Sequence, residues 1–138
     1  MYGTGYLLGI LLAILFYCLV ILPGDRRHYR KRLSLIRKKL NKPIEYLDAS
    51  GRLTIGFVNV NASSYSGITN AVVAHFDLRQ ASTRVHETDT ILQDFKKGND
   101  VIGLEWENRS GYNIKAKNQS SEPLVHDVAK YVQTYINL

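Results

Sequence analysis

The sequence has almost no cysteine. The one cysteine, Cys18, lies inside an apolar N-terminal run, so the chain cannot form an internal disulfide or a cysteine-based metal site. The histidines fall in separate predicted elements without the spacing of metal ligands; they are His28, His75, His86 and His126. We therefore expect packing alone to stabilise the fold, and we expect no metal or other cofactor.

Motifs of catalysis and nucleotide binding are also missing. The chain has no G-x-S-x-G, no P-loop and no G-x-G-x-x-G that opens a helix. Two pairs of titratable residues alternate along predicted strands, His75 with Asp77 and Glu105 with Glu107. Side chains on the outward face of a strand are usually just solvated. The sequence thus gives no positive support for an enzyme.

The positive charge is confined to one short segment. The formal charge is +6, from 18 Lys and Arg and 12 Asp and Glu. Residues 25–42 hold nine Lys and Arg against one Asp, whereas residues 43–138 hold nine against eleven Asp and Glu. The latter segment is slightly acidic, which disfavours a nucleic-acid footprint across it.

A long uncharged run occupies the N-terminus. Residues 2–22 carry no charged side chain, and as a helix of ~1.5 Å rise per residue they would reach ~30 Å, the thickness of a bilayer's hydrocarbon core. A cleaved signal peptide is the main alternative, but a basic segment before the run and a small-x-small site after it are both lacking. We predict a transmembrane anchor over residues 1–24.

The flanking charges predict the orientation of this anchor. Nine basic residues follow the run and none precedes it. Because Lys and Arg are retained on the cytoplasmic side, we expect the N-terminus outside and the C-terminal domain in the cytoplasm, at a bacterial inner membrane. Gly5, Gly9 and Ala13 share one helix face, which fits either helix packing, including self-association, or a plain lipid-facing surface.

A basic amphipathic helix is predicted directly after the anchor, over residues 25–42, with Asp25 as its N-cap. Tyr29, Leu33, Ile36 and Leu40 fall on one helical face. The cations around the rest of the helix favour contact with an anionic leaflet; they include Arg26, Arg27, Arg30, Lys31, Arg37 and Lys38. The alternatives are a topology signal only, or packing of the apolar stripe on the soluble domain.

Residues 43–138 are predicted to form a small soluble domain. Alternating apolar residues predict strands over residues 53–60 and 71–79, with a loop over 61–69 between them and a short helix over 89–97. A broad apolar face predicts a helix from about residue 121 to 136. The expected fold class is α+β: one N-terminal transmembrane helix, then an antiparallel sheet of about four strands covered by the C-terminal helix.

The clearest local prediction is a β-hairpin over residues 101–117. Its expected three-residue loop, residues 109–111, has Gly111 in the left-handed conformation. This loop would place Trp106 opposite Ile114 and, on the other face, Glu105 opposite Lys115. Trp106 is then expected in the core; if it were exposed instead, it would be a partner-binding anchor.

Two functions stay open at this point. The favoured one is a non-enzymatic protein-interaction domain at the cytoplasmic face of a membrane, as in an adaptor, a regulator or an immunity-type protein. The alternative is a small membrane-bound enzyme whose active site follows no recognised motif. A deep pocket lined by His75, Asp77 or Glu105 would favour the enzyme, whereas an exposed apolar patch rimmed by charge would favour the interaction domain.

Overall fold

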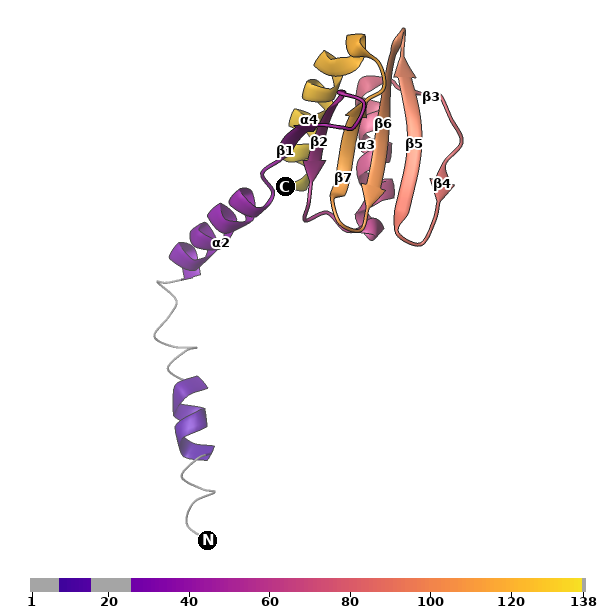
Figure 1. Ribbon diagram of the computed structural model, residues 1–138. Coiled ribbons are helices and arrows are strands. Elements are labelled where there is room, and N and C mark those ends of the chain that lie inside the picture. Colours follow the sequence, from indigo (N-terminus) through magenta and orange to yellow (C-terminus); the bar gives the residue numbers. More distant parts are fainter. Residues whose placement is uncertain (1–7, 16–25, 138) are drawn as a thin grey trace. The chain divides into compact units, whose positions relative to one another are not determined.

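The computed structural model describes residues 8–15 and 26–137 (Figure 1). The chain divides into two compact units, Met1–Arg37 and Lys38–Leu138. Most of the predicted transmembrane span, including Gly5, lies outside the described residues, and so does the predicted N-cap Asp25. Within the described segments, no helix combines the length and the apolar character needed to cross a membrane.

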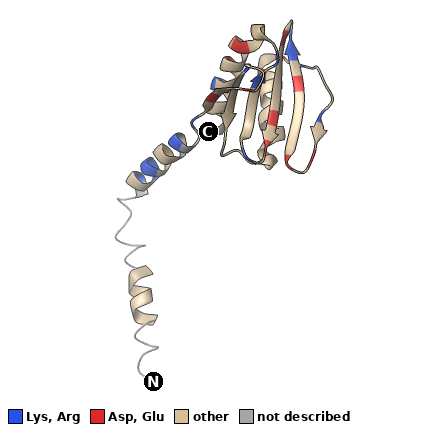
Figure 2. Ribbon diagram, viewed as in Figure 1, with Lys and Arg blue, Asp and Glu red and all other residues tan. Residues whose placement is uncertain are grey.

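Residues 8–15, which include Gly9 and Ala13, are helical and exposed. A second helix, α2 (Arg26–Leu40), lies where the amphipathic pattern predicts one. Tyr29, Leu33 and Ile36 form an exposed apolar stripe along one face, and Leu35 is exposed on another face of the helix. Figure 2 shows Lys and Arg along the same helix. Helix α2 is therefore amphipathic, with an apolar side and a basic side.

The second unit is built on a seven-stranded antiparallel sheet, in the order β1-β2-β7-β6-β5-β3, with β4 also paired to β5 (Figure 1). The strands are β1 (Ile44–Leu47), β2 (Leu53–Phe57), β3 (Arg79–Gln80), β4 (Val85–His86), β5 (Thr90–Lys97), β6 (Asp100–Glu107) and β7 (Gly111–Ala116). The predicted α+β class with an antiparallel sheet and a terminal helix is confirmed. The sheet has seven strands, and three of the additional ones are only two to four residues long.

Two helices, α3 (Tyr65–Phe76) and α4 (Glu122–Ile136), cover one face of this sheet (Figure 1). Each follows a short 3-10 turn, η1 (Ala62–Ser64) and η2 (Gln119–Ser121). Helix α4 contacts α3 and strands β2, β6 and β7. The fully buried side chains between the layers include Phe57, Tyr65, Val72, Leu104, Tyr112, Ile114, Val128 and Val132. The opposite face of the sheet carries no helix in the part of the chain that is described.

Helix α3 overturns the predicted loop over 61–69 and the predicted strand over 71–79. Tyr65, Ile68, Thr69 and Val72 are all buried, and their spacing of i, i+3, i+4 and i+7 marks one face of a helix. The helix ends at Asp77, which has a left-handed φ of 52° and donates its N–H to the Val73 carbonyl oxygen. The alternation of apolar and polar residues from 72 to 78 therefore predicted a strand wrongly.

Strand β5 overturns the predicted helix over 89–97. Ile91, Gln93 and Phe95 are buried on one face, whereas their neighbours are partly exposed. A period of two is typical of a strand. The prediction of a helix was wrong because Leu92, on the other face, made the apolar residues also fit a helical stripe. Gly98, with φ of +61°, belongs to the tight turn between β5 and β6 rather than to a helix end.

The β6–β7 hairpin confirms the prediction of two paired strands, with a different register. Gly111 has the expected left-handed φ, +74°, but it pairs with Glu107 and the loop is residues 108–110. Trp106 therefore faces Tyr112 instead of Ile114, and Glu105 faces Asn113. The register differs by two residues, so every side chain keeps its predicted face.

Candidate functional site

Strand β1 forms one edge of the sheet, and all four of its residues are exposed. The exposed fractions of its apolar residues are 53% for Ile44, 42% for Tyr46 and 67% for Leu47. Such large apolar side chains on an edge strand are unusual, because proteins tend to protect a sheet edge with charge or proline. We call these residues, with Glu45, the β1 edge.

The main chain of the β1 edge has free hydrogen-bonding groups. The Asp48 N–H donates to the Arg52 carbonyl oxygen (2.8 Å), so this pair just beyond the strand is hydrogen-bonded. Bonded and unbonded pairs alternate along an antiparallel ladder, so Tyr46 is bonded to β2 whereas Glu45 and Leu47 are not. The N–H and C=O groups of Glu45 and Leu47 therefore point away from the sheet, where another strand can pair with them.

The opposite edge of the sheet is closed by its own chain. The N–H groups of Ala81 and Ser82 both donate to the Asp94 carbonyl oxygen, at 2.9 and 3.3 Å. The Asp94 N–H in turn donates to Ser82 Oγ (2.9 Å). Strand β5 is thus paired with β3, β4 and the segment between them, and these two-residue strands form the far edge, whereas β1 offers four consecutive strand residues.

A charged cluster lies on the sheet face that bears no helix. The Glu105 side chain is only 6% exposed and lies 3.3 Å from Lys115 Nζ and 3.1 Å from Lys117 Nζ, which is also 3.6 Å from Asp94. A Cβ at Gly103 would lie 2.8 Å from Lys117 Cε, so the bare glycine lets these side chains lie flat. Burial alone would lower the pKa of Lys117, but the Glu105 and Asp94 carboxylates outweigh it and raise that pKa.

Tyr46 joins the β1 edge to this charged face. Its hydroxyl donates to Asn113 Oδ1 (3.4 Å), and burial raises its pKa. Tyr46 pairs with Thr54, which pairs with Lys115. The Thr54 hydroxyl is buried without a hydrogen-bond partner. The result is an apolar strip bordered by charge, the arrangement expected of a protein-interaction surface.

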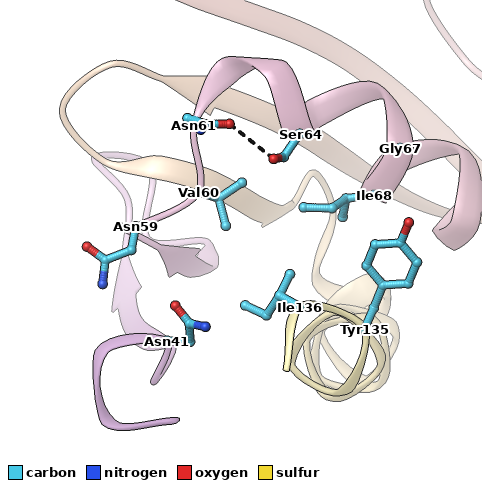
Figure 3. Close-up of a pocket in the computed structure, with 9 residues that line it drawn as sticks. All are labelled: Asn41, Asn59, Val60, Asn61, Ser64, Gly67, Ile68, Tyr135 and Ile136. Carbon is cyan, nitrogen blue, oxygen red and sulfur yellow. Dashed lines mark hydrogen bonds between the residues drawn. The ribbon is translucent and has the colours of Figure 1, made fainter. Parts of the chain in front are cut away.

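A pocket of about 360 Å³ lies between the ends of several elements (Figure 3). Its lining residues are Asn41, Asn59, Val60, Asn61, Ser64, Gly67, Ile68, Tyr135 and Ile136. Ser64 Oγ donates to Asn61 Oδ1 (3.0 Å), and Asn41 Nδ2 donates to Asn137 Oδ1 (3.4 Å). No Asp, Glu, His, Lys or Arg lines the pocket, and the side chains of its asparagine, serine and tyrosine residues can hydrogen-bond an uncharged group.

No protein-family model, no curated protein and no solved structure matches this chain. The candidate sites therefore have to be judged on their geometry.

The titratable residues singled out in the sequence do not come together. His75 lies in α3 and stacks on Tyr131 of α4, with ring centroids 4.2 Å apart. Asp77 caps α3 instead of sharing a strand face with His75. Glu107 accepts a hydrogen bond from Ser110 Oγ (3.3 Å), away from both. Asp77 lines a hollow of about 440 Å³ together with Arg79, Lys96, Lys97 and Gly98, whereas neither His75 nor Glu105 lines it. The described residues contain no cluster that could hold a metal ion.

Trp106 and the basic residues of α2 have different environments. Trp106 is 8% exposed and its indole N–H donates to the Val60 carbonyl oxygen (2.9 Å), so its ring belongs to the core. Arg27, Arg30 and Lys31 are exposed on α2. The side chains of the other predicted membrane-surface residues, Arg26, Arg37 and Lys38, lie outside the described part. The sequence pattern missed the β1 edge, because four residues are too few for a clear period.

Proposed function

We propose that this chain is a single-pass membrane protein whose domain, residues 43–138, binds a protein partner at the cytoplasmic face as an adaptor, regulator or immunity-type protein. The β1 edge is the observation that supports this proposal. Its outward main-chain groups and exposed apolar side chains are the features used when an extended segment of a partner adds a strand to a sheet. The bordering charges would select among partners.

The anchor and its orientation form the second part of the proposal. The uncharged run of residues 2–22 would span the bilayer, and the nine cations of residues 25–42 would stay in the cytoplasm. The exposed apolar stripe and the basic side of α2 suit a helix that lies on an anionic leaflet. Self-association through Gly5, Gly9 and Ala13 would add to this arrangement.

The alternative, a small membrane-bound enzyme, has less support. The pocket in Figure 3 has no Asp, Glu, His, Lys or Arg in its lining. His75 and Glu105, which the sequence singled out, lie in different elements, α3 and β6. An enzyme would need at least one group within hydrogen-bond reach of a reacting atom in a cavity. A binding module needs only the surface that β1 provides.

The test of the interaction surface is Leu47→Pro in the full chain. Because the Leu47 N–H points away from β2, proline there removes a donor for a partner strand without removing a bond of the ladder. Val85→Lys is the matched control, since Val85 is similarly exposed on β4 at the far edge. Affinity purification from detergent extract should recover a stoichiometric companion with the native chain and with Val85→Lys, but not with Leu47→Pro.

Two results would contradict this part of the proposal: recovery of the chain without a companion, or equal recovery with Leu47→Pro. Urea unfolding of each variant checks that the domain itself stays folded.

The anchor is tested separately on vesicles. We expect the chain to resist extraction with alkaline carbonate, and protease added to the periplasmic side to leave the domain intact. Release by carbonate would refute the anchor, and digestion of the domain from outside would refute its orientation.

A further inference from the structure

A second surface feature lies at the far end of the sheet, where β3 meets the end of β5. A hollow of about 440 Å³ is lined there by Asp77, Arg79, Lys96, Lys97 and Gly98. Three of these five residues are cations and one is an anion, in a unit that is otherwise slightly acidic. Figure 2 shows Lys and Arg at this end of β5. The hollow therefore concentrates positive charge where the rest of the domain does not.

Two of the cations in the hollow, Arg79 and Lys96, lie side by side, and Lys97 follows on the other face of β5. Arg79 and Lys96 are direct cross-strand partners in the β3–β5 pair, and like charges in that position destabilise a sheet. Arg79, Lys96 and Lys97 are exposed, and none of them forms an ion pair within the described segments. Asp77 lines the same hollow without bridging to them. This arrangement would be stabilised by an anion shared among the three cations.

We propose that this hollow binds a phosphate group. The planar guanidinium of Arg79 can hold two phosphate oxygens at once, and the two lysines add compact point charges beside it. Phosphate esters carry nearly two negative charges at neutral pH, which matches the net charge of the lining. The volume leaves room for the group that carries the phosphate, and a Cβ at Gly98 would meet no atom within 4 Å, so the entrance is open.

The position of Asp77 sets how strongly the hollow attracts phosphate. Its backbone is held by the end of α3, through the N–H bond to Val73 and a left-handed φ. Asp77 lines the hollow together with the cations, so its negative charge weakens their attraction for an anion. Asparagine has nearly the same shape and also tolerates the left-handed conformation, so Asp77→Asn changes the charge without changing the fold.

The site is independent of the proposed partner surface. The β1 edge and the hollow lie at opposite ends of the strand order, and no residue belongs to both. The failure of one proposal therefore leaves the other unaffected.

The experiment uses the full chain in phosphatidylcholine nanodiscs and follows the amide resonances of Lys97 and Gly98 by NMR. Inorganic phosphate and pyrophosphate should shift these signals saturably. Arg79→Gln and Lys96→Gln should each weaken binding roughly tenfold, as expected for the loss of one hydrogen bond to a charged group. Asp77→Asn should tighten it roughly threefold.

The matched control is Arg109→Gln, which removes one exposed charge at the other end of β6, in the turn before β7. It should leave the affinity unchanged. A separate arm replaces free phosphate with phosphatidic acid in the nanodisc; shifts of Gly98 in that arm alone would identify a lipid headgroup as the source of the phosphate. The proposal is overturned if neither arm shifts these amides saturably, or if Arg109→Gln weakens binding as much as Arg79→Gln.

Discussion

The backbone at the start of β7 allows a sharp prediction about stability. Gly111 has φ of +74°, and a Cβ there would collide with the Phe57 carbonyl oxygen and lie 2.8 Å from both the Cα and the carbonyl oxygen of Val58. Gly98 also has a positive φ, +61°, but a Cβ there would meet nothing within 4 Å. Alanine at either position is strained by the left-handed backbone; only Gly111→Ala also has to displace the main chain after β2.

The two variants should therefore differ by the cost of that displacement. Gly98→Ala is expected to lower the free energy of unfolding by about 1 kcal/mol, the cost of a left-handed alanine. Overpacking adds about 1 to 3 kcal/mol, and the atoms displaced here are main-chain atoms, so Gly111→Ala should cost about 3 to 4 kcal/mol. In a domain of this size, 1 kcal/mol corresponds to about 4 to 8 °C in the melting temperature.

Urea and thermal unfolding of the full chain in detergent measure the difference. Trp106 is the only tryptophan of the chain. It is buried in the β6–β7 hairpin, in which Gly111 is the first residue after the loop, so its fluorescence reports this region directly. Equal losses of stability in the two variants would refute the reasoning, because they would mean that the approach of β2 to Gly111 costs nothing.

Three further predictions concern the buried polar groups. Glu105→Gln should lower the free energy of unfolding in urea by about 1 to 2 kcal/mol, less than the 3 to 5 kcal/mol of a fully buried ion pair, because its lysine partners are partly solvated. Burial raises the pKa of Tyr112 above its ordinary value of 10.0, and the pKa of Lys117 is raised too. Both groups keep their protons to higher pH when folded, so their contribution to stability should be constant below about pH 10 and fall above it in pH-dependent urea titrations, less steeply in Tyr112→Phe. Trp106→Phe should cost about 2 kcal/mol by circular dichroism, from the lost hydrogen bond to Val60 and the smaller ring; an unchanged midpoint would contradict its place in the core.

The elements with a long, regular pattern could be predicted from the sequence. Helix α4 has a broad apolar face and Pro123 in its first turn, and α2 repeats its apolar residues at helical spacing. The β6–β7 hairpin has matching apolar faces and a glycine that suits the turn. Its register was wrong by two residues because the approach of Phe57 and Val58 fixes Gly111 beside Glu107, and a contact from β2 is not visible in the hairpin sequence.

The elements predicted wrongly are those whose apolar residues fit two periods. In α3, Val72, Phe76 and Leu78 suggested a strand, although the buried face of the helix starts earlier, at Tyr65. In β5, the run of Ile91, Leu92 and Phe95 suggested a helix. Partners from distant segments decided both cases: α3 packs on α4, and β5 pairs with β6 along its whole length.

Neither candidate site could be predicted from the sequence. The hollow proposed to bind phosphate combines the end of α3, β3 and the end of β5, and only the β3–β5 pairing brings Arg79 opposite Lys96. The β1 edge is a candidate site because, among the described strands, only β2 pairs with it, and this depends on the strand order rather than on the four residues themselves. The sequence motifs that were sought were all local, whereas both surfaces are products of topology.

The bond between Asn41 and Asn137 has a practical consequence. The two side chains stand 96 positions apart in the chain, yet their amides touch, so the domain starts and finishes at one corner. The domain therefore suits circular permutation: a short linker would join its first and last residues, and new termini could be placed in the solvent-facing turn of residues 108–110 without cutting a strand.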